Sequence, residues 1–197
     1  MARRTITIRY VLLGAAGGAL AGLSTLYPLG NLPAPTLFGQ CFGLDISNRC
    51  EGIDAAFYLF PGLIFGVLFA AAQLWRGLFD ARRVVTFALV SGVGNAVATL
   101  LCIGLFSWLS LALNIDFLDL PLALGGAIAG AAGSAIVIGA MRFLAIETRP
   151  VAPIVIGTAL GLLVPLVTEF HVAGDLAFYI VWQGGFAASL AASAAQG

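Results

Sequence analysis

Two amide side chains lie near the middle of long apolar stretches of this sequence. Asn95 lies in the uncharged run 84–108, and Gln183 follows Trp182 in the run 176–195. In an apolar environment, an amide without a hydrogen-bond partner costs roughly 2–7 kcal/mol. The two amides therefore either hydrogen-bond to neighbouring helices or line a cavity for a neutral or weakly polar ligand.

Two prolines interrupt other apolar stretches. Pro61, followed by Gly62, lies in the run 55–75, and Pro165 lies in the run 151–168. A proline inside a helix removes one N–H donor and permits a kink. Together with the amides, the prolines predict a solute cavity that opens outward beneath a long loop, with these candidate residues: Asn95, Gln183, Trp182, Pro61 and Pro165.

A cluster of acidic residues and the single histidine follows the second proline. Glu169, His171 and Asp175 lie within seven residues, and Asp116 and Asp119 are expected on the same side of the protein. These side-chain types suit a divalent cation or a proton-linked site. However, the spacing matches no defined metal motif, and a polar turn between two apolar helices explains the cluster equally well. No metal or cofactor is predicted.

Two of the three cysteines, Cys41 and Cys50, lie in the only long polar segment, residues 31–53. A disulfide that closes this short loop would stabilise it by about 2–3 kcal/mol on the chain-entropy model. The spacing is far from that of a Cys-x-x-Cys redox pair, so a structural disulfide is predicted. Cys102 lies within an apolar run and is expected to be a buried small hydrophobic residue.

The composition explains why these polar residues are so few. The chain of 197 residues is 61% hydrophobic and 9% charged, with a mean hydropathy of +1.06. Soluble domains carry roughly 25% charged residues, so a soluble domain is excluded. The absence of lysine excludes a retinal protein, which needs a lysine Schiff base.

Six uncharged stretches are long enough to cross a bilayer as helices, which takes about 20 apolar residues. Strands are excluded because the stretches do not alternate apolar and polar residues. The sequence thus predicts an all-α polytopic integral membrane protein, a single domain over residues 1–197 with six transmembrane helices and a long periplasmic loop at 31–53. The predicted spans are 10–30, 55–75, 84–108, 120–141, 151–168 and 176–195.

The arginines predict the orientation of these spans. With six crossings, eight of the nine arginines fall on one side, and only Arg49 falls on the other. The positive-inside rule makes the arginine side cytoplasmic, so both termini are expected inside. Aromatic residues near the predicted interfaces fit aromatic belts; they are Tyr10, Tyr58, Trp75, Trp108 and Tyr179. Localisation in a bacterial inner membrane is expected.

Small residues recur at four-residue spacing, as in helices that pack closely in membranes. The spaced glycines form three runs: Gly14-x3-Gly18-x3-Gly22, Gly125-Gly126-x3-Gly130-x2-Gly133 and Gly157-x3-Gly161. The pattern predicts tight helix contacts, either within the chain or with a partner.

The architecture resembles that of the substrate-capture subunits of energy-coupling-factor vitamin transporters. The shared features are six spans, a long first outer loop and small residues in the first span (Ala15-x3-Ala19). The resemblance implies a ligand pocket near the outer face and small-residue helices that dock to a partner. No diagnostic ligand motif accompanies it.

These features favour a non-enzymatic inner-membrane protein that binds or translocates a small solute, for example as the membrane subunit of a transporter. The alternative is an accessory or scaffold subunit of a larger membrane complex, because intramembrane charges, which ion-coupled carriers normally possess, are missing. An intramembrane enzyme is the third reading, but Ser134 near mid-span and His171 near the surface would not meet. Expected partners are the lipid bilayer, other membrane subunits or further copies of the chain, and a small solute; nucleic acid is not expected.

Overall fold

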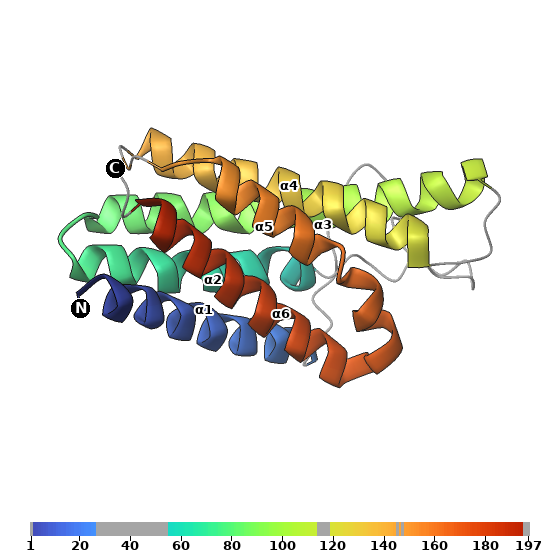
Figure 1. The fold of residues 1–197 in the computed structure, drawn as a ribbon, viewed down its shortest axis with the longest axis horizontal. Coiled ribbons are helices and arrows are strands. Elements are labelled where there is room, and N and C mark those ends of the chain that lie inside the picture. Colours follow the sequence, from blue (N-terminus) through green and yellow to red (C-terminus); the bar gives the residue numbers. More distant parts are fainter. Residues whose placement is uncertain (1, 27–54, 114–118, 145, 147, 195–197) are drawn as a thin grey trace.

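The computed structural model describes residues 2–26, 55–113, 119–144, 146 and 148–194, and all of its regular elements are α-helices. The helices are α1 (Ala2–Leu26), α2 (Ala55–Trp75), α3 (Ala81–Leu113), α4 (Asp119–Phe143), α5 (Val151–Gly161) and α6 (Val164–Ala194). They form one elongated bundle with both ends of the chain at the same end (Figure 1). Each helix packs against the next in sequence, and α6 packs against α1, which closes the ring.

Three helical stretches within the described residues are long and apolar enough to cross a membrane: Ala81–Ser110, Leu120–Phe143 and Leu176–Ser193. Shorter apolar helices run over Tyr10–Leu23, Leu59–Trp75 and Val151–Gly161. The protein is therefore all-helical where described and compatible with a membrane location. Helix α2 begins and ends where the second span was predicted.

The structure differs from the prediction between the fifth and sixth spans. The apolar run 151–168 is divided, because α5 ends at Gly161 and α6 already begins at Val164. Pro165 explains the break, since it has no N–H to donate to the carbonyl of Gly161 and its ring would clash with that carbonyl in a continuous helix. The polar segment 169–175, expected as a turn, is part of α6, whose first turns curve before the helix runs back along the bundle (Figure 1).

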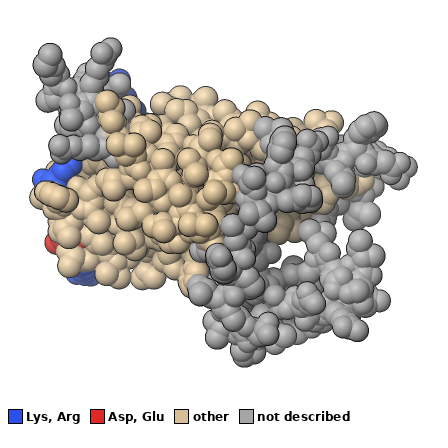
Figure 2. Space-filling view, turned by 90° about the horizontal axis from the view of Figure 1, so that it is seen from below, with Lys and Arg blue, Asp and Glu red and all other residues tan. Residues whose placement is uncertain are grey.

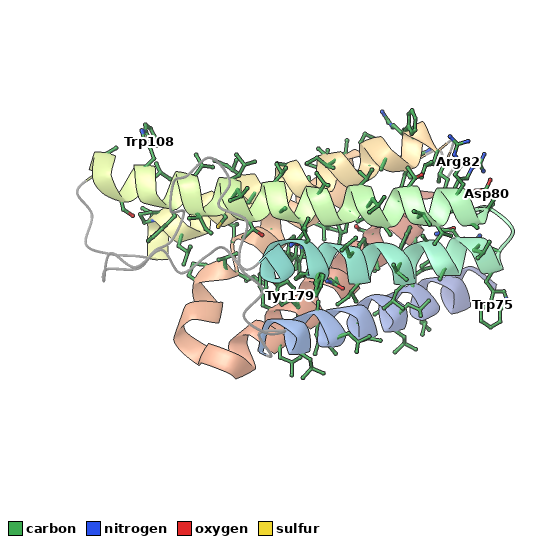
Figure 3. All side chains as sticks on the ribbon, turned by 180° about the vertical axis from the view of Figure 1, so that it is seen from behind. Trp75, Asp80, Arg82, Trp108 and Tyr179 are labelled. Atoms are coloured by element: carbon green, nitrogen blue, oxygen red, sulfur yellow. The ribbon has the colours of Figure 1, made fainter. Side chains whose placement is uncertain are left out.

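The charged side chains that the structure describes gather at the end of the bundle that carries the two termini. Figure 2 shows the described charges at this end and an uncharged surface along the bundle, and Figure 3 places Asp80 and Arg82 there, opposite Trp108. We call this end the arginine end; its described basic residues are Arg76, Arg82, Arg83, Arg142 and Arg149. Asp80 begins α3 here, because its Oδ1 accepts a hydrogen bond from the N–H of Arg83 (2.7 Å).

The predicted interface aromatics divide into two kinds. Trp75 and Trp108 are 93% and 63% exposed at opposite ends of the bundle (Figure 3), as residues of aromatic belts would be. Tyr10 and Tyr179 are buried instead, and the side chain of Tyr58 lies outside the described residues. The hydroxyl of Tyr10 accepts a hydrogen bond from Nη1 of Arg76 (3.0 Å), so this tyrosine holds α1 to the end of α2 rather than facing lipid.

The spaced glycines pack within the chain. A Cβ added at Gly14 or Gly18 would overlap the backbone of α6, at Gln183 and Tyr179 respectively. Gly126 and Gly130 of α4 lie in the same way against Gly161 and Gly157 of α5; this pairing brings two helix backbones into direct contact. Two helix backbones can approach this closely only where the facing residues have no side chain. These glycines therefore account for the close contacts of α1 with α6 and of α4 with α5.

Candidate solute cavity

Four of the five predicted cavity residues come together in one place. Pro61 of α2, Asn95 of α3, and Trp182 and Gln183 of α6 line a small cavity of about 50 Å³, which we call the niche. Its other walls are small or aromatic; they are Gly62, Phe65, Ser91, Gly94, Ala98, Gly133, Ser134, Val137 and Phe186. Pro165, the fifth candidate, lies outside the niche, and its part is the helix break described above.

Gln183 connects three helices at the niche. Its Nε2 donates a hydrogen bond to the carbonyl oxygen of Pro61 (3.0 Å), which joins α6 to α2. Its Oε1 lies beside Gly17 of α1, where an added Cβ would come within 2.9 Å of it, and has no hydrogen-bond partner. The side chain is only 6% exposed, so one half of a buried amide is satisfied by the protein and the other half is not.

Ser91 is the second residue of the niche with an unsatisfied oxygen. Two other hydroxyls in the cavity walls bond to their own helix: Thr99 of α3 and Ser134 of α4 each donate to the carbonyl oxygen four residues earlier, at 2.9 and 2.7 Å. The Ser91 hydroxyl makes no such bond and is buried, at 3% exposure. Burying a hydroxyl without a hydrogen-bond partner destabilises the folded state by about 1–3 kcal/mol, and such groups are rare in folded proteins.

A larger cavity adjoins the niche toward the end of the bundle opposite the arginine end. This cavity, which we call the chamber, has a volume of about 330 Å³ and lies among α3, α4, α6 and the α5–α6 break. Its walls are mostly apolar; they are Ala98, Thr99, Cys102, Ile103, Leu122, Gly126, Ala129, Gly130, Gly161, Val164, Phe178, Tyr179 and Trp182. Ala98 and Trp182 line both cavities, so they form the boundary between niche and chamber.

The helix break contributes to the chamber directly. Gly161, the last residue of α5, and Val164, the first of α6, both line it. Helix α5 spans only about 16 Å at 1.5 Å per residue, roughly half of a hydrocarbon core. Interrupted backbone at such a depth is tolerated where it is buried in protein or lines a cavity, which is its situation here.

Aromatic rings separate the cavities from the arginine end. Phe65 and Phe186 line the niche with ring centroids 5.8 Å apart, and Phe69 and Phe87 continue the packing below them. A second group, Phe178 and Tyr179, surrounds Trp182 at 5.4 and 6.4 Å in the wall of the chamber. From the arginine end outward, the interior thus changes from an aromatic core to the niche, which is lined by Asn95 and Gln183, and then to the chamber.

The side chains of the other predicted site residues lie outside the part of the chain that the structure describes. Cys41, Cys50 and Asp116 lie outside the described residues. The backbone at Asp119 begins α4, and the backbone at Glu169, His171 and Asp175 belongs to α6, while their side chains lie outside the description. Cys102, expected to be buried, is a half-buried free thiol in the chamber wall.

Sequence reasoning missed the chamber and Ser91, although one signal for Ser91 was present. Ser91, Asn95 and Thr99 recur every four residues and therefore lie on one face of α3. A polar row in an apolar helix marks the face that turns inward. The sequence contains no comparable signal for the chamber. Its lining residues are mostly small or apolar, as are the residues at most contacts between membrane helices.

No family model matches the chain, and neither curated proteins nor solved structures show a significant similarity to it. The resemblance to energy-coupling-factor capture subunits accordingly rests on the predicted topology, the first loop and the small residues of the first helix.

Proposed function

We propose that this chain is a non-enzymatic bacterial inner-membrane protein that binds or passes a small neutral solute through the niche and chamber. The observation that carries the proposal is a chamber of about 330 Å³ beside a niche that is lined by Ser91, Asn95 and Gln183. Ligand pockets are typically roughly 300–1,000 Å³, mostly apolar, with few polar groups that orient the ligand. Among the described residues, neither the lining of the niche nor that of the chamber includes Asp, Glu, Lys, Arg or His. This absence of charge from the described walls favours an uncharged ligand.

The proposal includes six membrane crossings with both termini in the cytoplasm. Its support is the gathering of the described arginines at one end (Figure 2), which is the end where both chain ends lie (Figure 1). From Arg83, Cys102 lies about 28 Å further along α3 at 1.5 Å per residue. If the arginine end lies at the inner interface, this rise places the chamber in the outer half of a core roughly 30 Å thick.

Reporter fusions test this orientation. Green fluorescent protein joined after Gly197 is expected to fluoresce, and alkaline phosphatase at the same position to be inactive, because only the former works in the cytoplasm. Phosphatase inserted between residues 114 and 118 is expected to be active. An active phosphatase after Gly197 would contradict the proposed topology.

Native mass spectrometry of protein released from its own membrane tests the function. We expect a small-molecule mass on the wild-type chain. Ala129→Leu, which adds bulk to the chamber wall, is expected to lower its occupancy by about tenfold or more. Ala135→Leu is the matched control, since Ala135 is exposed on the same helix.

Two results would contradict solute binding in the chamber. One is a chain without any adduct that carries stoichiometric protein subunits, which would favour the accessory-subunit function. The other is an adduct equally abundant in wild type and Ala129→Leu, which would place the bound molecule outside the chamber.

A further inference from the structure

We propose that the arginine end is a binding surface for anionic phospholipids, whose headgroup phosphates are contacted by its arginines at the membrane interface. The inference goes beyond the proposed function, because it concerns the end of the bundle remote from the chamber. It rests on the membrane location of the bundle and not on solute binding. Three observations carry it: the charge of this end, the bonding of its guanidinium groups and the exposed aromatic residues beside them.

The described side chains of the arginine end carry an excess of positive charge. Five of them are arginines, whereas Asp80 provides the single carboxylate among the described side chains (Figure 2). One oxygen of Asp80 already accepts the backbone N–H of Arg83. The backbone of three more arginines lies in the first turns of α1 at the same end (Figure 1); they are Arg3, Arg4 and Arg9. Clusters of basic residues next to a membrane span attract anionic lipids of the cytoplasmic leaflet.

Three guanidinium groups of this end are held in place by neutral oxygens of the bundle. The pairs are Arg76 with the hydroxyl of Tyr10, Arg83 with the carbonyl of Leu78 and Arg142 with the carbonyl of Thr148, at 3.0, 3.1 and 3.2 Å. Each bond uses one of the five N–H donors of an arginine, and a neutral acceptor does not cancel the positive charge. The remaining donors of a planar guanidinium suit phosphate oxygens, which they can bind in pairs. Groups that are already held in this way lose less side-chain freedom when a phosphate binds.

Exposed aromatic side chains stand beside two of these arginines. Trp75 precedes Arg76 at the end of α2, and Phe143 follows Arg142 at the end of α4. Both aromatic side chains are almost fully exposed, and Figure 3 places Trp75 at the same end as Arg82. Exposed tryptophan is typical of the headgroup level of a bilayer. The neighbouring arginines then lie at the level of the lipid phosphates.

Two tryptophans can report on the lipids at the two ends of the bundle. Trp75 lies exposed at the arginine end and Trp108 lies exposed at the opposite end (Figure 3). The third tryptophan of the chain, Trp182, lines the cavities between them. Replacing two of the three by phenylalanine therefore gives one variant with Trp75 alone and a matched control with Trp108 alone.

The test uses nanodiscs that contain phosphatidylglycerol and phosphatidylcholine in equal amounts. In one sample the phosphatidylglycerol carries bromine on its acyl chain near the headgroup, and in the other sample the phosphatidylcholine does. Bromine quenches tryptophan at short range, so comparing the two samples gives the relative affinity of the two lipids beside each tryptophan. At Trp75 we expect phosphatidylglycerol to bind roughly three- to tenfold more strongly, the contribution of about one arginine near a membrane surface. At Trp108 we expect no preference.

Substitutions of two arginines assign this preference to the surface. Arg82→Gln together with Arg142→Gln is expected to lower the preference at Trp75 to less than about twofold. Lysine at both positions keeps the two charges, so this pair of substitutions is expected to retain at least half of the preference. The lysine variant thereby separates the loss of charge from the loss of the bond between Arg142 and Thr148.

Three results would overturn the lipid surface and leave solute binding in the chamber intact. They are equal affinity of the two lipids at Trp75, the same preference at Trp108, and a preference that persists in the glutamine variant. If neither brominated lipid quenched either tryptophan, the bundle would not lie in the membrane. That result would overturn both the lipid surface and the proposed membrane crossings.

Discussion

Gly130→Ala is expected to destabilise the folded bundle by about 2 kcal/mol or more. A Cβ at this position would overlap the carbonyl oxygen of Gly157, so α4 and α5 must separate. Overpacking of a tight contact typically costs roughly 1–3 kcal/mol, and here both partners are helix backbone, which cannot adopt another rotamer. The measurement is unfolding by SDS in dodecyl maltoside micelles, followed by circular dichroism.

Gly139→Ala on the same helix is the matched control. Nothing lies within 4 Å of a Cβ added there, so the substitution creates no clash. Alanine is favoured over glycine in a helix by about 1 kcal/mol, and the control is expected to be neutral or slightly stabilising. Equal effects of the two substitutions would contradict the close approach of α4 to α5.

The same glycines connect stability to the site. Gly126 and Gly130, with Gly161 opposite them, line the chamber as well as the α4–α5 contact. Close backbone approach at these positions therefore fixes one wall of the chamber. Gly130→Ala should shift this wall, and ligand occupancy by native mass spectrometry is expected to fall along with stability.

Hydropathy predicted where helices occur better than where they break. Charged residues bound α2 and α3 closely, at Asp54, Arg76 and Asp80, so these helices begin near the predicted positions. The run 151–168 contains no charge, and hydropathy alone gives no reason to divide it. The break depends on a local steric effect of Pro165, which acts on the residues before it.

The niche was partly predictable because polar groups in apolar helices are rare and must turn inward. This reasoning selected Asn95 and Gln183, and the structure places both in one cavity. It could not find Gln183's partner, because the carbonyl oxygen of Pro61 is an ordinary backbone atom 122 residues away in sequence. The chamber was not predictable, since its volume depends on how four elements meet and not on any residue type.

Phe87→Ala is expected to have the largest effect of a single side-chain deletion, about 3 kcal/mol. Phe87 is fully buried, and its ring lies 5.6 Å from that of Phe69 and 5.9 Å from that of Phe79. Truncation of a buried phenylalanine in soluble proteins costs about 3–5 kcal/mol. The lower value is expected here, because lipid is itself apolar and the loss is mainly packing.

Leu89→Ala controls for this substitution, because Leu89 is 57% exposed on the same helix and should cost little. Ser91 lies one helical turn from Phe87, so the void should form next to the niche. An apolar void of this kind binds benzene, and added benzene is expected to restore part of the lost stability of Phe87→Ala alone. Equal stability of the two variants would mean that Phe87 is not tightly packed against Phe69 and Phe79. The aromatic side chains could then not form the packed layer that separates the niche from the arginine end.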